Sequence, residues 1–228
     1  MSESEAVKMP KVNPKRIAVF VVILVLIALA GWFSHQRWWG SRAWLYGYDE
    51  AHRGLEEGGY PWIGAEKPVI TIHEYIDYEC PHCPEAHKRM RMAMRSYLDE
   101  VRLVRHDYAR MACVPNDKEK RRSSCAVARA AYCASKEGRY WEWNDHVMQN
   151  PRPLTGQERK IFIGDTAREM GFNVKAFDTC MFETETIDMV QGVFKDTRKK
   201  GIRQTPTYFV DGEMYLLVEV IDLIDDRL

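Results

Sequence analysis

One short stretch constrains the fold of this chain more than any other. An apolar, alternating run over residues 68–78 leads into Glu79-Cys80-Pro81-His82-Cys83-Pro84, and a helical pattern follows from Pro81 to about Tyr97. The alternation predicts a strand, and the pattern after it predicts a helix. The fold must therefore bring the end of a strand to the start of a helix at two cysteines spaced as a compact dithiol, which favours reversible disulfide chemistry.

The two cysteines are expected to have different roles. Cys80 would lie at the helix N-terminus, where unpaired N–H groups and the helix dipole stabilise a thiolate. Cys83 lies roughly one turn further on, so its sulfur is more buried and can resolve a mixed disulfide formed at Cys80. Pro81 suits the first helical position because it has no N–H, and His82 adds a ring N–H beside the thiolate. Both residues stabilise the reduced form, which predicts a strong oxidant.

Two cysteines at this spacing can also serve a zinc site, a haem or a structural disulfide. They would form half of a zinc site, but His73, His87 and the remaining cysteines show no second CxxC or HxxxH spacing. Haem attachment is excluded because Pro84 follows Cys83. A structural disulfide across two residues would constrain little chain entropy. We therefore expect a redox site with no metal and no cofactor, with zinc as the minor alternative.

The N-terminal region predicts a membrane anchor. Residues 17–33 hold no charged or strongly polar side chain and would reach roughly 25 Å as a helix, the short end of a membrane span. Basic residues precede this run at Lys8, Lys11, Lys15 and Arg16. Interfacial residues lie at its end, at Trp32, and beyond it, at Arg37, Trp38, Trp39 and Arg42. The positive-inside rule then predicts a cytoplasmic tail over 1–16, a single-pass anchor in the lipid bilayer over 17–36, and a C-terminal domain outside the cytoplasm.

A cleaved signal peptide is the alternative for the same segment. Ala28-Leu29-Ala30 resembles the small-x-small pattern of a cleavage site, and a mature chain would then begin at Gly31. The apolar run continues past this triplet into Trp32 and Phe33, which favours an uncleaved anchor. Both alternatives predict export of the domain.

The remainder of the chain predicts one water-soluble domain of the α/β class. Residues 37–66 show no strand period and are expected to be a juxtamembrane connector, and the domain is expected over 67–228 with a helical insertion at about 110–192. Equal counts of 33 basic and 33 acidic residues give no sign of a nucleic-acid partner. The expected elements are strands 69–76 and 101–108, helices 124–138, 140–149, 155–171 and 184–200 with a short one after 173, strands 207–210 and 214–217 joined by a turn at Asp211-Gly212, and a final helix from about 218.

An acidic residue is embedded in the first predicted strand. Glu74 lies six residues before Cys80. A buried carboxylate near a dithiol can relay protons as the resolving thiol ionises, whereas a partly exposed surface acid is the alternative for a strand position. We therefore include Glu74 among the candidate catalytic residues.

Three motifs in order resemble the DsbA-like branch of the thioredoxin superfamily. They are GAEKPVITIHEYIDYECPHCP at 64–84, ARAAYCASKEGRYWEWND at 128–145 and TPTYFVDG at 205–212. The resemblance implies a thioredoxin fold interrupted by a helical subdomain, with Glu74 as the buried acid. It also implies that Pro206 is a cis-proline facing the active disulfide, and that the backbone of Thr205 pairs with an extended substrate.

Four further cysteines, Cys113, Cys125, Cys133 and Cys180, raise the question of disulfide pairing. Six cysteines permit 15 pairings, and the sequence alone does not choose among them. The resemblance implies a structural bond between Cys133 and Cys180. Cys113 and Cys125 would then close a short loop, or form a second redox pair that relays electrons.

The resemblance implies a protein disulfide oxidoreductase. The predicted N-terminal anchor would hold it at the bacterial cytoplasmic membrane with its catalytic domain in the periplasm or outside the cell. Reduced exported proteins would be its substrates, and a membrane quinone-linked oxidase of the DsbB or VKOR type would reoxidise it. A thiol reductase or isomerase could use the same residues in the opposite direction. A non-enzymatic role, as a metal-binding or assembly subunit that retains the fold, is the other alternative.

Overall fold

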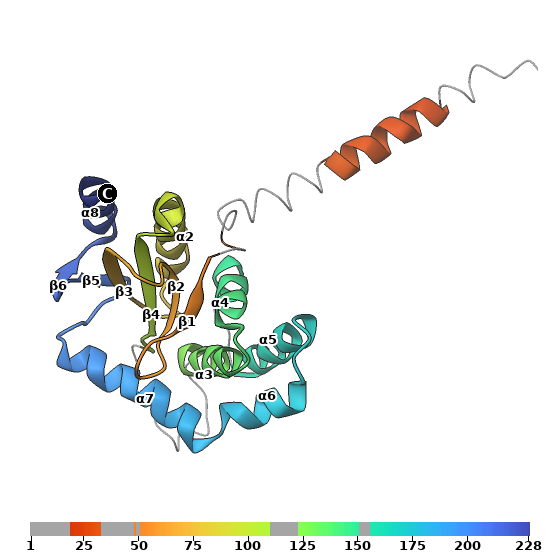
Figure 1. Cartoon of the computed structure of the whole chain (residues 1–228). Helices are drawn as coiled ribbons and strands as arrows, with labels where there is room; N and C mark the ends of the chain where they lie inside the picture. The colour runs from red at the N-terminus through yellow and green to blue at the C-terminus, as the bar shows by residue number, and fades with distance from the viewer. Residues whose placement is uncertain (1–18, 33–47, 49–50, 110–122, 151–155) are drawn as a thin grey trace, which may run out of the picture. The chain divides into compact units, whose positions relative to one another are not determined.

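The computed structural model describes residues 19–32, 48, 51–109, 123–150 and 156–228. The chain divides into two compact units, Met1–Ala43 and Trp44–Leu228, and each is described by itself. Figure 1 shows the helix of the first unit and the sheet and helices of the second.

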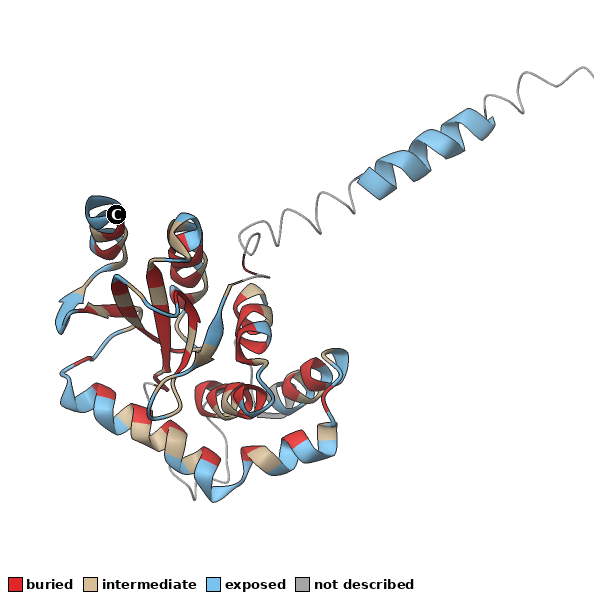
Figure 2. Cartoon of the chain, viewed as in Figure 1, coloured by how far each residue is buried: buried red, intermediate tan, exposed pale blue. Residues whose placement is uncertain are grey.

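In the first unit, residues 19–32 form a helix whose residues are all exposed (Figure 2). This helix falls within the predicted 17–36 segment, and the rest of that segment lies outside the described residues. Among the residues that the structure describes, no helix is both long enough and apolar enough to cross a membrane. Anchoring in a bilayer therefore stays a prediction.

The second unit is built on one mixed six-stranded sheet. Its strands are β1 (Arg53–Leu55), β2 (Pro61–Gly64), β3 (Ile70–Ile76), β4 (Val101–Asp107), β5 (Thr207–Val210) and β6 (Glu213–Tyr215). Their order across the sheet is β1-β2-β4-β3-β5-β6, with β3 and β4 parallel and every other neighbouring pair antiparallel. Asp211 and Gly212 both have positive φ angles and join β5 to β6, which confirms the predicted two-residue hairpin turn.

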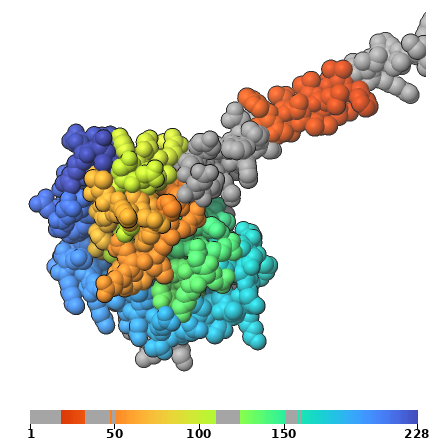
Figure 3. All heavy atoms as spheres, in the orientation of Figure 1, coloured from red at the N-terminus to blue at the C-terminus, as the bar shows by residue number. Residues whose placement is uncertain are grey.

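The helices of this unit are α2 (Cys83–Met94), α3 (Ser123–Lys136), α4 (Tyr140–Gln149), α5 (Gly156–Glu169), α6 (Val174–Met181), α7 (Thr184–Lys199) and α8 (Leu217–Arg227). Helices α2 and α8 pack against each other, and their spheres adjoin on the surface in Figure 3. They cover the sheet face that carries Glu74, which contacts His87 of α2. Helix α7 borders the opposite face, and α3 packs against α4, α5, α6 and α7. The predicted thioredoxin-like core and helical insertion are both present.

Two strands of the sheet were not expected from the sequence. β1 and β2 lie within residues 37–66, where the pattern indicated only a connector. β1 has three residues and β2 four, so neither is long enough to show a periodicity. β2 pairs with β4 through Trp62 and Val104, which makes this segment part of the domain.

The active-site helix also begins later than expected. α2 starts at Cys83 with His82 as its N-cap and Pro84 in its first turn, so the prediction that Pro81 occupies the first helical position is wrong. The reason is a preceding turn, in which the N–H of Cys80 donates to the carbonyl of Asp77 at 3.0 Å and the N–H of Cys83 donates to that of Cys80 at 3.2 Å. This turn separates the strand from the helix.

Candidate functional site

The two cysteines of the motif lie at the end of the central parallel strands. Both are free thiols; Cys80 is partly exposed and Cys83 is fully buried. The sulfur of Cys80 lies 3.2 Å from the carbonyl oxygen of Thr205, and the peptide bond between Thr205 and Pro206 is cis, as the resemblance implied. The fold thus brings the dithiol and the Thr205-Pro206 segment together across 125 residues of sequence.

The local contacts of Cys80 favour its thiolate. A hydrogen bond from the Cys83 thiol is the largest influence; burial opposes it, and the side chain of Thr205 together with the backbone N–H groups of His82 and Cys83 adds to it. The net result lowers the pKa of Cys80 to about 5. A thiol with this pKa is largely ionised at neutral pH, so Cys80 can act as an attacking or leaving sulfur.

Cys83 has the opposite character. Burial raises its pKa well above the usual range for a thiol, and the hydrogen bond to Cys80 raises it further. Its side chain packs in a small apolar cluster with Ile76 and Met148, against which Tyr78 also packs. In the reduced protein Cys83 therefore remains a neutral thiol that donates to the Cys80 sulfur.

The residues between the two cysteines contribute less through their side chains than expected. Pro81 and His82 are both exposed. The influence of His82 on the pKa of Cys80 comes from its backbone N–H, and its ring is not among the leading causes. The helix start matters here more than the imidazole does, because an N–H at a helix N-terminus points at the thiolate whatever side chain the residue carries.

Glu74 is fully buried, as predicted, but its environment differs from that of a proton relay. Its Oε2 lies 3.1 Å from Nη2 of Arg105, and its Oε1 accepts a hydrogen bond of 3.2 Å from Tyr208. Burial alone would raise the pKa of Glu74, but the Arg105 charge, the neighbouring His87 and the hydrogen bond from Tyr208 lower it to about 2. A carboxylate with this pKa is a weak base at neutral pH. The geometry therefore favours a structural and electrostatic role for Glu74.

A wider ionic network surrounds Glu74, and the sequence pattern did not predict it. Nη2 of Arg105 lies 2.6 Å from Nδ1 of His87, whose Nε2 lies 3.0 Å from Oδ1 of Asp145. Asp145 also pairs with Arg91 at 3.2 Å. All five side chains are almost fully buried, and two carboxylates face two guanidinium groups with His87 between them. Only the strand register, which places Arg105 opposite Glu74, could have indicated part of this network.

The histidines considered as zinc ligands lie in separate places. His87 belongs to the ionic network, whereas His73 lies on the opposite sheet face, since side chains alternate along β3. Within the described part of the chain, no group of three or more His, Cys, Asp or Glu side chains is arranged to hold a metal ion.

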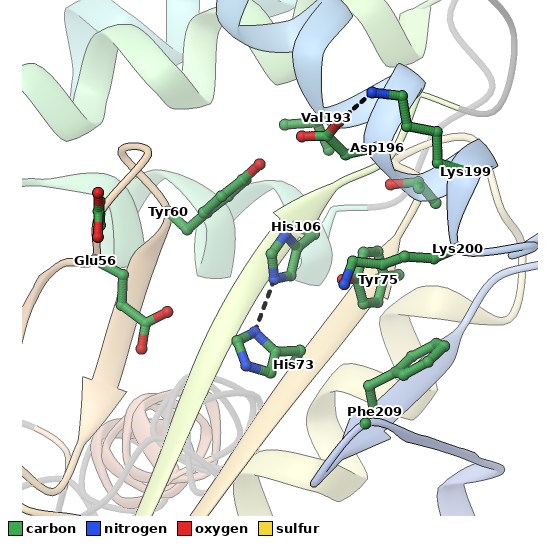
Figure 4. A pocket seen from close by; sticks show the side chains of 13 residues that line it. Glu56, Tyr60, His73, Tyr75, His106, Val193, Asp196, Lys199, Lys200 and Phe209 are labelled. Carbon is green, nitrogen blue, oxygen red and sulfur yellow. Dashed lines mark hydrogen bonds and ion pairs between the residues drawn. The ribbon is translucent and has the colours of Figure 1, made fainter.

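A cleft with a cavity volume of about 530 Å³ lies between α7 and the sheet face that carries His73 (Figure 4). Nδ1 of His73 lies 3.0 Å from Nε2 of His106, and the ring of Tyr75 stacks on that of His106 with centroids 4.3 Å apart. Burial lowers the pKa of both histidines, and the nearby Lys200 adds to this effect. The imidazoles are thus neutral at pH 7, and the cleft lies across the sheet from Cys83.

The disulfides lie in the helical region. Cys133 of α3 and Cys180 of α6 form a disulfide, which is the pairing that the resemblance implied. Cys125 is also disulfide-bonded. Cys113 lies outside the described residues, so the pairing of Cys113 with Cys125 stays a prediction.

A partly exposed, acidic cysteine, a buried thiol one turn later and a facing cis-proline on a mixed sheet define a thioredoxin-type dithiol site. The sequence matches the thioredoxin family over residues 56–222, and the chain belongs to this family.

Solved structures share the fold. A thioredoxin-like oxidoreductase from Silicibacter pomeroyi DSS-3 has a TM-score of 0.60 and 21% identity, covering 75% of this chain and 92% of that one. The thiol-disulfide exchange protein alpha-DsbA2 from Wolbachia pipientis has a TM-score of 0.60 and 14% identity over 82% and 96%. MdbA, a thiol-disulfide oxidoreductase from Corynebacterium matruchotii, has a TM-score of 0.56 and 19% identity over 78% and 94%. At these identities the likeness shows the fold.

Similar sequences also occur within larger membrane proteins. The Na(+)/H(+) antiporter NhaA of Herminiimonas arsenicoxydans is 28% identical over 201 residues, which cover 84% of this chain and 29% of that protein. The Na(+)/H(+) antiporter NhaA 3 of Salinispora tropica is 23% identical over 159 residues, which cover 67% and 22%. The chain therefore spans less than a third of the length of these curated relatives.

Proposed function

We propose that this protein is an extracytoplasmic dithiol oxidase that introduces disulfides into exported proteins through Cys80 and Cys83. The observation that carries the proposal is the contrast between the two sulfurs, since the pKa of Cys80 is lowered to about 5 and that of Cys83 is raised well above its usual range. Cys80 is also the more accessible sulfur, and so the one that a substrate thiolate can attack.

The proposed reaction has two exchange steps. A substrate thiolate attacks the sulfur of Cys80, the bond between Cys80 and Cys83 breaks, and its electron pair leaves with Cys83, which then takes up a proton. A second substrate thiolate attacks the substrate sulfur of the mixed disulfide, and Cys80 leaves as a stable thiolate. The substrate loses two electrons and the protein gains two. The backbone of Thr205, next to the cis bond, would pair with the extended substrate.

The proposed direction of electron flow rests on the stability of the reduced form. Hydrogen bonds that stabilise the Cys80 thiolate lower the free energy of the reduced protein, and this raises its reduction potential. A high potential favours oxidation of substrates. The opposite direction, as a reductase or isomerase, would require a potential low enough for the reduced form to be the donor.

The proposed location is the outer side of the bacterial cytoplasmic membrane. Residues 17–36 would anchor the chain in the bilayer, with residues 1–16 in the cytoplasm. A membrane quinone-linked oxidase of the DsbB or VKOR type would reoxidise the dithiol, and anchoring would raise its effective concentration. We further propose that Cys113 pairs with Cys125 in a structural disulfide.

A second candidate function is suggested by the antiporter relatives. The match to NhaA of Herminiimonas arsenicoxydans spans 201 residues, and the N-terminal unit of this chain holds only 43, so most of the match falls in the thioredoxin-like unit. We propose as the alternative that this domain serves as an accessory part of a membrane transport assembly. A Cys80→Ser variant separates the two, because it abolishes a dithiol oxidase and leaves a purely structural subunit functional.

Redox titration of the full chain tests the proposed function. The protein would be equilibrated with glutathione buffers, and its thiols trapped with a mass-tagged alkylating reagent. A potential more oxidising than that of the glutathione pool supports the oxidase, whereas a potential below it supports a reductase. A Cys83→Ala variant whose Cys80 has first been converted to a mixed disulfide with glutathione, by oxidised glutathione, should pass this bond to reduced exported proteins, releasing glutathione and accumulating mixed disulfides with them. A Cys80→Ala variant treated in the same way, as the matched control, should accumulate none.

A further inference from the structure

A second acidic residue lies closer to the active-site turn than its position in the sequence suggests. Asp107 ends β4 and pairs with Ile76, the last residue of β3. Ile76 packs against Cys83. Partner residues on parallel strands direct their side chains to the same face, so Asp107 and Ile76 share the face that α2 covers.

The hydrogen bonds of Asp107 connect it to the active-site turn. Its Oδ1 accepts a hydrogen bond of 2.7 Å from the hydroxyl of Tyr140 on α4. The hydroxyl of Tyr78, two residues before Cys80, lies 3.5 Å from that of Tyr140 and donates to Oδ1 of Asn144 at 3.2 Å. The ring of Tyr78 packs against the cluster that contains Cys83. Asp107 is therefore linked through Tyr140 to Tyr78, which contacts the surroundings of the buried thiol.

Asp107 can also exchange protons with its surroundings, whereas Glu74 is sealed. Asp107 is partly exposed, and Glu74 has no exposed surface. Asp107 and Arg105 line a small cavity of about 20 Å³ that is bordered by the hydroxyl-bearing residues Tyr132 and Ser135. The Arg105 charge is already neutralised by Glu74 at 3.1 Å, so it compensates Asp107 less completely.

We propose that Asp107, rather than Glu74, is the carboxyl group whose protonation is coupled to the redox state of the dithiol. The negative charge of Asp107 would disfavour the Cys80 thiolate of the reduced protein. This inference rests on the proposed dithiol exchange. Asp107 acts through space as a positioning residue, since no described contact joins it to either sulfur.

The pKa values agree with this assignment. Partial burial raises the pKa of Asp107 to about 6, against the lowering influence of Arg105 and of the hydrogen bond from Tyr140. The titratable and charged groups that face Asp107 are Glu74 on β3, Arg105 on β4, Tyr78 in the active-site turn, Tyr132 on α3, Tyr140 on α4 and Tyr60 before β2. Among the carboxyl groups in this set, Asp107 changes charge near neutral pH, and Glu74 stays ionised.

The expected size of the effect follows from Coulomb's law. Ile76 contacts Cys83, and neighbouring strands lie about 4.8 Å apart, which puts Asp107 roughly 10 Å from the sulfurs. Two unit charges at that distance, with an effective dielectric constant of about 20, shift an ionisation by about one pK unit. Removing the Asp107 charge should therefore change the equilibrium with glutathione about tenfold.

The test compares Asp107→Asn with the wild-type full chain in glutathione buffers between pH 5 and pH 8. At pH 8 the equilibrium of the variant with glutathione should lie about tenfold further toward the reduced protein. The reason is that the reduced variant lacks the repulsion between the Asp107 carboxylate and the Cys80 thiolate. At pH 5 the two proteins should agree within about twofold, because Asp107 is then protonated. The exposed acid Glu85 in the first turn of α2 provides the matched control, and Glu85→Gln should change the equilibrium less than twofold at every pH.

The inference is overturned if the ratio of the two equilibrium constants with glutathione, variant to wild type, stays constant from pH 5 to pH 8. Such a result would indicate a merely structural role for Asp107 and would leave the proposed oxidase activity intact. Failure of the wild-type dithiol to exchange with glutathione overturns both proposals. A second measurement does not depend on folding of the variant. The ¹³C shift of the wild-type Asp107 carboxyl should titrate near pH 6 in the reduced protein and at lower pH in the oxidised protein, and a titration below pH 4 in both forms overturns the inference.

Discussion

The sulfur of Cys80 lies 3.2 Å from the carbonyl oxygen of Thr205. The antiparallel pairing of β3 with β5 brings the two residues together, because β3 leads into the dithiol and the Thr205-Pro206 segment leads into β5. A substrate segment attached to Cys80 would therefore meet the backbone of Thr205. This arrangement makes the chemistry of Cys80 depend on a segment at the other end of the domain.

The buried thiol of Cys83 should control the acidity of Cys80, because its hydrogen bond is the largest influence on the pKa of Cys80. We expect Cys83→Ala to raise the pKa of Cys80 by on the order of one unit or more. In Cys83→Ser a hydroxyl can still donate, so the increase should be smaller. Thiolate absorbance at 240 nm against pH measures both variants. Equal pKa values in Cys83→Ala and the wild type would contradict this account.

The ion pair of Glu74 and Arg105 should contribute to stability in a pH-dependent way. The pKa of Glu74 is lowered from 4.5 to about 2, so its contribution is present above pH 4.5 and is lost as the pH falls toward 2. Glu74→Gln leaves Arg105 buried without a counter-charge, and it should cost about 3–5 kcal/mol at pH 7.

Urea unfolding of the wild type and Glu74→Gln measures this contribution. The difference between the two free energies of unfolding should shrink by about 3 kcal/mol between pH 4.5 and pH 2. Tyr208→Phe, which removes only the hydrogen bond to Glu74, should cost about 1 kcal/mol. A difference between wild type and Glu74→Gln that does not vary with pH would rule out an ionised Glu74 in the folded protein.

The segment before the predicted domain boundary should be essential to the fold. Gly64 in β2 has a φ of 111°, and a Cβ atom there would overlap the carbonyl oxygen of Val101. We expect Gly64→Ala to reduce the free energy of unfolding by about 3 kcal/mol or more. Gly164 in α5 has open space around it, so Gly164→Ala should stabilise the domain by about 1 kcal/mol. Equal stabilities of the two variants would show that β2 is dispensable.

The disulfide between Cys133 and Cys180 should stabilise the domain without entering the redox cycle. It closes a separation of 47 residues, which predicts a contribution of roughly 3–4 kcal/mol in the chain-entropy model. The double variant Cys133→Ser with Cys180→Ser should lose this stability and keep its exchange rate with glutathione. A large fall in the exchange rate of the folded double variant would instead implicate the pair in electron transfer.

Most regular elements could be predicted because their residues carry a local pattern. The helix over 140–149, the strand over 207–210 and the Asp211-Gly212 turn all agree with the sequence, since amphipathic periodicity and turn chemistry depend on neighbouring residues. The strands at 53–55 and 61–64 were missed because they are too short to show a period, and only pairing with β4 makes them strands. The start of α2 was misplaced because a turn held by Asp77 separates it from β3.

The site was predictable as a dithiol but not as an electrostatic environment. The spacing of Cys80 and Cys83 indicated the chemistry directly. The neighbours that decide the acidity of the carboxyl groups come from other strands and helices, such as Arg105 beside Glu74 and Tyr140 beside Asp107. A sequence pattern carries no information about such contacts, which is why Glu74 was expected to be a proton relay.

The pH dependence of alkylation of the reduced protein tests the central claim most directly. The full chain would be treated with iodoacetamide between pH 4 and pH 9, and the modified cysteine identified by mass spectrometry. We predict that Cys80 reacts first and that its rate rises with an inflection near pH 5, because its thiolate is stabilised by Cys83, the side chain of Thr205 and the start of α2. An inflection near pH 8.5, as for an ordinary thiol, would contradict the account.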